Sequence, residues 1–261
     1  MRVLERGNPA PFHHRRGPVG CLLLHGFPGS PAEMRLLGAY LAERGVSALA
    51  PLLPGHGTVP EDLRGVRWGD WVMATEAALE ELRRGCTVVF VCGLSMGGVL
   101  ALNLAARLPV AGVIALAPVI RVRDPRFELA NLFSRIVVWV EPDDAPDDLA
   151  DPQGRALSWH YRRYPTAAVR ELLGLVRATR RLLRRIQAPT LMVQSPKDRF
   201  LDPAGFQWAY EQIPAVDKTM VWLERSGHNI AIDVEKEEVY RRTYQFIARL
   251  AGVGRAGAET A

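Results

Sequence analysis

The chain has 261 residues, of which 48% are hydrophobic and 23% are charged, and its formal net charge is +5. This ordinary globular composition excludes wholesale disorder, collagen-like repeats and coiled coil, and the length predicts one domain or two. No apolar run is long enough to span a membrane, since a spanning helix needs about 18 apolar residues or more.

Three cysteines occur, at Cys21, Cys86 and Cys92. Their number is odd and too small for a disulfide framework, and two of them lie inside apolar runs, so we expect buried free thiols. The N-terminal segment lacks the apolar stretch of a signal peptide. Together these features predict a cytoplasmic protein.

Short apolar, β-rich runs alternate with helical patterns along the chain. The apolar runs predict strands at 19–24, 46–53, 87–92, 110–117, 190–194 and 219–223. Helical patterns occupy about 31–44, 68–84, 96–108 and 234–250, and Asp202-Pro203 caps a further helix. Continuous apolar strands separated by helices predict a mostly parallel sheet of about six or seven strands, with helices on both faces.

The first predicted helix has clear boundary signals. Ser30-Pro31-Ala32-Glu33 fits a capping box with proline at the first helical position. The pattern ends at about Arg44, and Gly45 supplies the stop.

One long insertion interrupts the alternation, because about 70 residues separate the strand ending at 117 from the strand starting at 190. Helical patterns at 127–138 and 166–185 surround an acidic, proline-rich run at 141–148. We expect a small helical cap at 119–187, a core made of 1–118 and 188–252, and a frayed tail at 253–261. We interpret the acidic run as a solvated loop and expect no metal, because its carboxylates lack an anchoring histidine or EF-hand spacing.

The strongest functional motif is Gly93-Leu94-Ser95-Met96-Gly97, which fits G-x-S-x-G between a predicted strand and a predicted helix. Side chains two residues either side of the serine would collide in so sharp a turn, which explains Gly93 and Gly97. The turn lifts the Ser95 hydroxyl above the sheet, beside the N-terminus of a helix. Ser95 is therefore the predicted nucleophile, and the alternative is a glycine-rich turn with a capping serine.

A serine nucleophile needs a base, and the base needs an acid that orients it. His228 follows the predicted strand 219–223, and Asp198 follows the predicted strand 190–194. The order Ser95, Asp198, His228 is the order of α/β-hydrolases. Asp202, which we expect to cap a helix, and Asp124 are the alternative acids.

An oxyanion hole needs two backbone N–H donors. Met96 follows the nucleophile and supplies one, and the loop after an early strand supplies the other. That loop reads His25-Gly26-Phe27-Pro28, and the Phe27 amide is predicted because proline has no N–H.

Further motifs extend along the chain: LLLHGF at 22–27, PGHG at 54–57, WGDW at 68–71, APT at 188–190 and SGH at 226–228. With these motifs the chain resembles α/β-hydrolases of the bacterial carboxylesterase and monoacylglycerol lipase group over nearly its whole length. The resemblance implies the α/β-hydrolase fold, with the cap inserted after the sixth strand of the family order. Because the N-terminal segment is short, we expect the early antiparallel strands of larger hydrolases to be missing.

The resemblance also implies a function. It implies a serine carboxylesterase that hydrolyses short- to medium-chain acyl esters through an acyl-enzyme intermediate, without a cofactor. It assigns the triad to Ser95, Asp198 and His228 and the oxyanion hole to Phe27 and Met96.

Other functions remain open. Monoacylglycerol lipases of this group carry a glycerol-binding glutamate in the cap, and Ser158 stands at the corresponding position, which favours a carboxylesterase. Monoacylglycerol lipase, thioesterase, lactonase and amidase are the alternative activities, and a ligand-binding scaffold with the same fold is the non-enzyme alternative.

The expected partner is a small-molecule ester. The arginine-rich stretch 177–185 resembles a basic binding surface, but we interpret it as a solvated or ion-paired helix face. We therefore expect no nucleic-acid binding, no stable membrane insertion, and a monomer or weak homo-oligomer.

Overall fold

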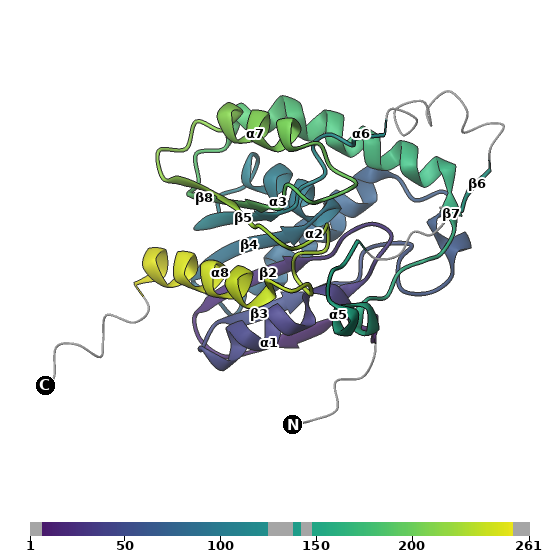
Figure 1. Cartoon of the computed structure of the whole chain (residues 1–261). Coiled ribbons are helices and arrows are strands. Elements are labelled where there is room, and N and C mark those ends of the chain that lie inside the picture. The colour runs from purple at the N-terminus through teal and green to yellow at the C-terminus, as the bar shows by residue number, and fades with distance from the viewer. Residues whose placement is uncertain (1–6, 125–137, 142–147, 253–261) are drawn as a thin grey trace, which may run out of the picture.

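A computed structural model describes residues 7–124, 138–141 and 148–252 (Figure 1). Its centre is a seven-stranded sheet with the order β1-β3-β2-β4-β5-β8-β9. The strands are β1 (Phe12–His14), β2 (Val19–Leu24), β3 (Ser47–Ala50), β4 (Val88–Leu94), β5 (Gly112–Leu116), β8 (Thr190–Gln194) and β9 (Lys218–Trp222). All neighbouring strands pair in parallel except β1 with β3. The predicted mostly parallel sheet is confirmed.

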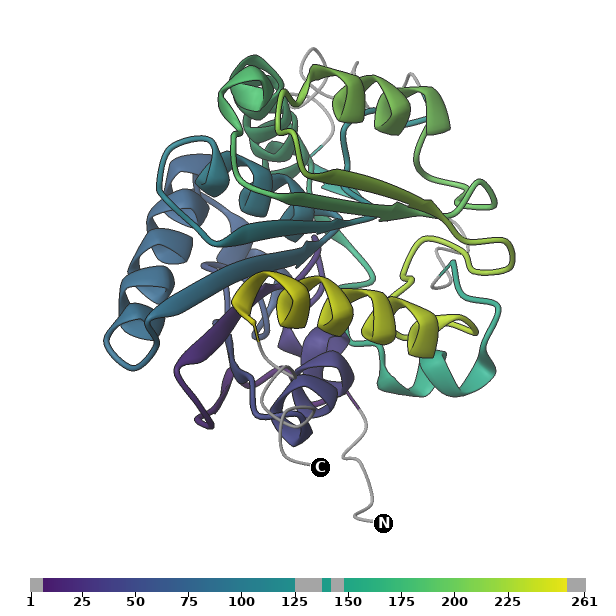
Figure 2. The same cartoon turned by 90° about the vertical axis from the view of Figure 1, so that its left-hand side faces the viewer.

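Helices cover both faces of this sheet (Figure 2). One face carries α1 (Arg35–Glu43) and α8 (Lys236–Ala251), and the other carries α2 (Trp68–Arg83), α3 (Met96–Ala105), α6 (Thr166–Leu182) and α7 (Pro203–Gln212). The central strands β2 and β5 are buried along their whole length, whereas the edge strand β9 is partly exposed. The continuous apolar runs of the sequence thus arise because both sheet faces are covered.

The remaining described elements are short. Single 3₁₀ turns are η1 (Pro31–Met34), η2 (Pro60–Leu63) and η3 (Leu183–Arg185). Strands β6 (Trp139–Val140) and β7 (Tyr164–Pro165) form an antiparallel pair apart from the main sheet, and α5 (Pro152–Leu157) lies between them in the chain.

Helix α6 belongs by sequence to the predicted cap segment, yet it packs among the helices that cover one face of the central sheet. It contacts α2 and α3, and the buried Asn103 Nδ2 donates to Thr179 Oγ1 at 2.9 Å. The predicted helix at 127–138 lies, except for Val138, outside the described residues, and so does the tail at 253–261. The division into core and cap therefore stays a prediction.

Two sequence predictions at the N-terminal edge need correction. An early antiparallel strand is present, because β1 pairs with β3 through Phe12 opposite Ala50. At three residues it is too short to give a readable pattern. The first helix begins as the 3₁₀ turn η1, in which Ser30 Oγ accepts from Ala32 N at 3.4 Å, and only then continues as α1.

Two further predictions concern the state of the cysteines and the presence of membrane-spanning helices. All three cysteines are buried free thiols, as predicted. Within the described ranges, no helix combines the length and the apolar character that crossing a membrane requires.

Replacing Thr179 by valine tests how firmly α6 is joined to α3. Thr179→Val keeps the side-chain shape but leaves the buried Asn103 Nδ2 without its acceptor. We expect the free energy of unfolding to fall by about 1–3 kcal/mol, the usual cost of an unsatisfied buried polar group. Urea unfolding followed by circular dichroism measures it, and the m value should not change.

The matched control is Thr219, which is exposed on β9. Thr219→Val should alter stability by less than about 0.5 kcal/mol. Equal urea midpoints for Thr179→Val, Thr219→Val and the wild type would contradict a stabilising link between α6 and α3.

Candidate active site

Ser95 lies in a strained turn between β4 and α3. Its φ of 55° and ψ of −114° are values that residues other than glycine rarely adopt. The Ser95 N–H donates to Leu116 O of β5 at 2.9 Å, and the Ser95 carbonyl accepts from Val99 N at 3.2 Å. The turn is thus held between the neighbouring strand and the helix that follows.

The two glycines of the motif are sterically required. A Cβ on Gly93 would collide with the Gly97 carbonyl oxygen, and a Cβ on Gly97 would collide with the Leu24 carbonyl oxygen at the end of β2. The collision expected from the sequence therefore exists at Gly93 within the turn itself. At Gly97 the obstacle is the neighbouring strand.

The three residues predicted as a triad come together in one hydrogen-bonded chain. His228 Nε2 lies 2.9 Å from Ser95 Oγ, and His228 Nδ1 lies 2.7 Å from Asp198 Oδ2. They come from the segments that follow β4, β8 and β9. Asp202, an alternative acid, instead caps α7, where its Oδ1 accepts from Ala204 N at 2.9 Å.

Asp198 is buried and held as an acceptor. Its Oδ1 accepts from Phe200 N at 2.8 Å and from Leu201 N at 2.9 Å. Burial by itself raises the pKa of this carboxyl, but His228 and the two backbone N–H groups outweigh burial and leave the pKa lowered. The carboxylate therefore stays ionised and directs the His228 Nδ1 proton.

The pKa of His228 is raised although the ring is half-buried. Burial lowers the pKa, whereas the carboxylates of Asp198, Asp148 and Glu33 raise it and prevail. With Nδ1–H donated to Asp198, the neutral ring has its Nε2 lone pair toward the Ser95 hydroxyl.

Two buried histidines, His25 and His56, lie in the neighbouring loops. His25 Nδ1 donates to Gly26 O at 2.9 Å, and its Nε2 accepts from Leu53 N at 3.1 Å. Burial and the neighbouring His56 lower the pKa of His25 to about 3, and burial lowers that of His56 to about 4. Both rings are neutral near pH 7, so His25 is a fixed cross-link between the loops after β2 and β3.

The segments that carry the predicted oxyanion donors adjoin the serine. Met96 is the first residue of α3, where N–H groups have no partner within the helix. The loop that contains Phe27 passes against the nucleophile, since a Cβ on Gly26 would lie 3.3 Å from Ser95 Cβ. The Phe27 ring packs edge-on against His56 and Tyr164, with centroids 5.7 and 5.2 Å away.

Glu33 is a buried residue of this site whose role the sequence reasoning missed. Its Oε2 accepts from Gly26 N and its Oε1 accepts from Asn229 Nδ2, both at 3.2 Å. The predicted capping-box glutamate therefore joins the loop of Phe27 to the loop of His228. No local signal could have shown this, because the local pattern describes a helix start.

Two further carboxylates fix the backbone that leads to His228. Asp233 Oδ2 accepts from Gly227 N at 2.7 Å. Glu235 Oε2 accepts from the Ser226 N–H and hydroxyl, both at 2.7 Å. The sequence does contain an indication of these two acids, because they follow the predicted histidine loop within ten positions.

The interpretation of the acidic run as a solvated loop is wrong for its last residue. Residues 142–147 lie outside the described part, but Asp148 is buried and forms an ion pair with Arg199 at 2.8 Å. The arginine and nearby backbone N–H groups make burial of this charge tolerable. Among the residues that the structure describes, no cluster of three or more His, Cys, Asp or Glu could hold a metal ion.

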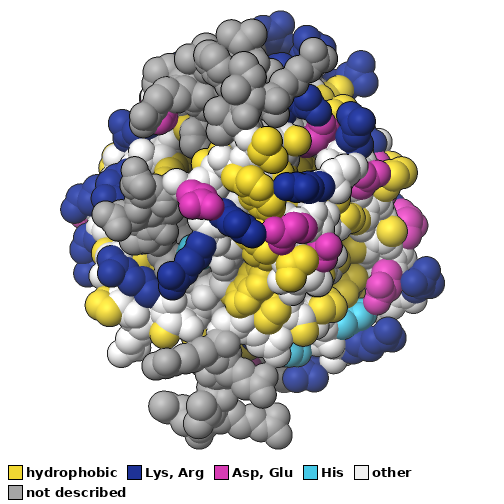
Figure 3. All heavy atoms as spheres, turned by 90° about the vertical axis from the view of Figure 1, so that its right-hand side faces the viewer, with side chains coloured by type: hydrophobic (Ala, Val, Ile, Leu, Met, Phe, Trp, Pro, Cys, Tyr) yellow, Lys and Arg dark blue, Asp and Glu magenta, His cyan; other side chains and the backbone are white. Residues whose placement is uncertain are grey.

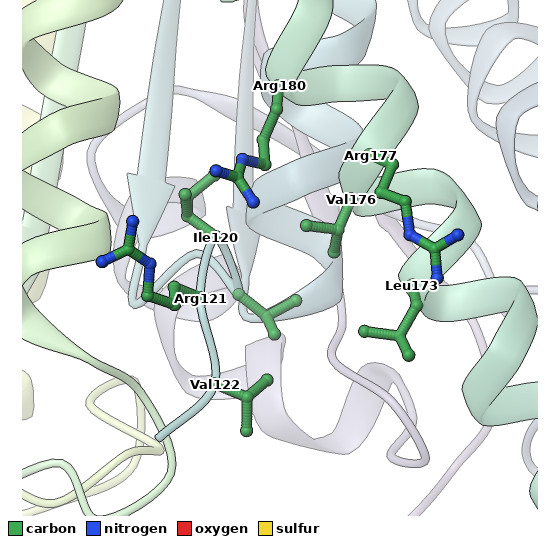
Figure 4. Close-up of a pocket in the computed structure, with 8 residues that line it drawn as sticks. Ile120, Arg121, Val122, Leu173, Val176, Arg177 and Arg180 are labelled. Atoms are coloured by element: carbon green, nitrogen blue, oxygen red, sulfur yellow. The ribbon is translucent and has the colours of Figure 1, made fainter. Parts of the chain in front are cut away.

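A pocket of about 270 Å³ lies between α6 and the segment after β5 (Figure 4). Apolar side chains line most of it, and arginines complete the lining: Val119, Ile120, Val122, Leu173, Val176, Arg121, Arg177 and Arg180. Val119 N donates to the Ser95 carbonyl at 3.4 Å, so one wall begins beside the nucleophile. On the face that carries β6 and β7, apolar side chains form a band between charged groups (Figure 3).

Comparison with known proteins places the chain in a family. Residues 19–235 match the model of the Hydrolase_4 family, described as serine aminopeptidase, S33. The chain belongs to this family.

Two curated relatives match this Hydrolase_4 protein over most of its length. A thermostable monoacylglycerol lipase of Bacillus sp. (strain H-257) is 33% identical over 242 residues, which are 93% of this chain and 95% of the lipase. A carboxylesterase of Bacillus subtilis (strain 168) is 29% identical over 243 residues, which are 93% of this chain and 97% of the esterase.

Solved structures agree with the family. One from work on LipS and LipT, two metagenome-derived lipolytic enzymes, has a TM-score of 0.88 at 29% identity and covers 93% of this chain and 98% of its own. The monoacylglycerol lipase of Paleococcus ferrophilus has a TM-score of 0.78 at 21% identity, covers 92% of this chain and 99% of its own, and shows the fold alone. The Hydrolase_4 protein has the α/β-hydrolase fold.

Titration of the histidine rings tests the electrostatics of the site. We expect His228 to titrate above the ordinary histidine pKa of about 6.5 and Asp198→Asn to lower that pKa, because the nearest carboxylate charge is removed. Proton and nitrogen NMR of the ring signals measures both. His25, with its pKa of about 3, should not titrate between pH 5 and 9 and serves as an internal reference. An unchanged His228 pKa in Asp198→Asn would contradict the described pairing.

Proposed function

We propose that this Hydrolase_4 protein is a serine carboxylesterase that hydrolyses short- to medium-chain acyl esters through an acyl-enzyme intermediate. The hydrogen-bonded chain from Asp198 through His228 to Ser95, on a strained turn beside a helix N-terminus, is the observation that carries the proposal. The names of the two Bacillus relatives support an ester as the substrate. The buried free thiols support the predicted cytoplasmic location.

In the acylation step, His228 Nε2 takes the Ser95 hydroxyl proton while Ser95 Oγ forms a bond to the ester carbonyl carbon. The carbonyl oxygen becomes an oxyanion, which the Phe27 and Met96 amides stabilise. Collapse of the tetrahedral intermediate breaks the bond to the alcohol oxygen, and His228 donates its proton to the leaving alcohol. Asp198 holds the imidazolium without taking the proton.

In the deacylation step, water replaces the alcohol. His228 removes a proton from water, the hydroxide oxygen bonds to the acyl carbon, and the same two amides stabilise the second oxyanion. Breaking the bond to Ser95 Oγ releases the carboxylic acid, and His228 returns the proton to the serine. The preformed N–H donors act in both steps, and losing one such donor typically costs about 10²–10³ in rate.

The pocket beside Ser95 is suited to the acyl chain. Its five apolar lining residues can take an alkyl group, with three arginines beside them, and its volume of about 270 Å³ supports short to medium chains over long ones. Val119 lies in the pocket wall and its N–H donates to the Ser95 main-chain carbonyl, so this wall adjoins the backbone of the proposed nucleophile.

Monoacylglycerol lipase is the second candidate, and the relative with 33% identity favours it. In the segment after α5, Ser158 Oγ lies 3.2 Å from His160 Nδ1, so this chain presents a serine hydroxyl where a glycerol-binding glutamate is expected. Rates on 1-monolaurin and ethyl laurate separate the two functions. A carboxylesterase accepts both esters, whereas a monoacylglycerol lipase prefers the glycerol ester.

Replacing the nucleophile tests the proposed reaction directly. Ser95→Ala should lower hydrolysis of p-nitrophenyl esters, from acetate to palmitate, by about 10⁴-fold or more and leave the fold intact. Initial rates and circular dichroism measure both quantities. Wild-type rates in Ser95→Ala would refute the mechanism, and a folded wild-type protein without multiple turnover on any ester would favour the ligand-binding scaffold.

Narrowing the pocket tests the acyl-chain assignment. Val176→Phe fills part of the pocket, so kcat/KM for the longest well-used ester should fall at least about tenfold, with acetate little affected. The optimum should move to a shorter chain. Val216, which is fully exposed, provides the control variant Val216→Phe. An unchanged chain-length profile in Val176→Phe would place the acyl group elsewhere.

A further inference from the structure

Asp148 joins the two loops that meet at the candidate triad. Its Oδ2 accepts from Arg199 N at 2.8 Å and from His228 N at 3.1 Å. Its backbone carbonyl also accepts from His228 N, at 2.9 Å. Arg199 directly follows the acid Asp198, so one carboxylate holds the backbone beside the acid and the backbone of the base.

We propose that Asp148 is a positioning residue for the reaction, which sets the separation of Asp198 and His228 by clamping the backbone of their two loops. The inference rests on the proposed serine hydrolase function. Asp148 does not contact the reacting atoms. It lies in the segment preceding α5, far in sequence from both loops.

Asp148 is buried, and both of its carboxylate oxygens accept hydrogen bonds. Its side chain is only 8% exposed, and its Oδ1 accepts from Arg199 Nε at 2.8 Å. Hydrogen bonds to an ionised acceptor are short and about twice as strong as neutral ones. With both carboxylate oxygens engaged, the side chain has little freedom to rotate, and the two loops are held at a defined distance.

The close approach of Asp148 also explains a glycine beside the base. A Cβ on Gly227 would collide with the Asp148 carbonyl oxygen. The backbone of Asp148 and the backbone that enters His228 are therefore in direct contact. Asp233, which accepts from Gly227 N at 2.7 Å, holds the same peptide from the other direction.

Asp148 affects His228 through its charge as well as through its hydrogen bonds. The charged groups around His228 are the carboxylates of Asp198, Asp148 and Glu33, with the Arg199 guanidinium beyond Asp148. The Arg199 side chain is 67% exposed, so solvent screens its charge more than that of the buried carboxylate. Neutralising Asp148 should therefore lower the pKa of His228, because a charge that stabilises the imidazolium is lost.

The alternative is that Asp148 only anchors its own segment, and a neighbour offers the matched control. Asp151, three residues later, caps α5 by accepting from Gln153 N at 2.8 Å and pairs with Lys236 at 2.8 Å. Asp151→Asn removes one negative charge from the same segment, as Asp148→Asn does. Among the described contacts, the Asp151 side chain bonds to neither Arg199 nor His228, and asparagine keeps the backbone N–H that donates to Asp233 Oδ1 at 2.8 Å.

The experiment compares Asp148→Asn, Asp148→Ser, Asp151→Asn and Arg199→Gln with the wild type. The rate of p-nitrophenyl butyrate hydrolysis is expressed per active site titrated with a fluorophosphonate, so that only folded enzyme is counted. The dependence of kcat/KM on pH is measured for each variant, and thermal unfolding is followed separately.

We expect kcat and kcat/KM of both Asp148 variants to fall together by about 10- to 100-fold, with KM little changed, since misplacing a catalytic group by about 1 Å has effects of this size. The acidic limb of their pH profiles should move to lower pH. Asp151→Asn should keep the wild-type profile. Arg199→Gln keeps the backbone N–H and should stay within about threefold of wild type.

Several outcomes would overturn the clamp. Wild-type kcat and an unmoved acidic limb in the Asp148 variants, with only a lower melting temperature, would make Asp148 a structural anchor. A loss in Arg199→Gln equal to that in Asp148→Asn would assign the effect to the ion pair. A wild-type protein that hydrolyses no ester would refute the proposed function alone, and the pH dependence of Ser95 labelling by the fluorophosphonate would then decide on the clamp.

Discussion

The space available to the backbone where β4 turns into α3 is the constraint on which the site depends. Gly97 passes so close to the end of β2 that no side chain fits there, and Ser95 is held in a left-handed conformation with its N–H bonded to β5. Three neighbouring strands therefore determine where the serine hydroxyl lies. The same parallel order brings the Phe27 loop and the Val119 segment to the same edge of the sheet.

Carboxylates hold the irregular loops around that turn. Loops lack the regular hydrogen-bond ladders of helices and strands, so their backbone N–H groups need other acceptors. Here buried or half-buried acids from four parts of the chain supply them: Glu33, Asp148, Asp198, and the neighbouring Asp233 and Glu235. Three of these acids also raise the pKa of His228, so the arrangement that orders the loops also tunes the base.

The sequence predicted the sheet and singled out Ser95, Asp198 and His228, which the structure brings into contact, because chemistry limits which residues can stand at those points. The turn at Ser95 demands glycines on either side, and the catalytic order follows the strands. Glu33 and Asp148 escaped prediction because their partners lie 196 and 80 positions away. Their local contexts, a helix start and an acidic run, describe other structures equally well, and β1 is too short for any periodicity to emerge.

The segment between β5 and α6 leaves the sheet at a defined point. Val122 forms an antiparallel bridge with Leu201, and Arg123 N donates to Phe200 O at 2.8 Å. It rejoins the core at α6, which is packed against α2 and α3. Such a segment has the anatomy of an exchangeable module, open to replacement by shorter or longer versions in evolution or by grafting. On our proposal for Asp148, any replacement must bring its own acceptor to that place, so variation of the segment is bounded by the need to hold the loops of Asp198 and His228 together.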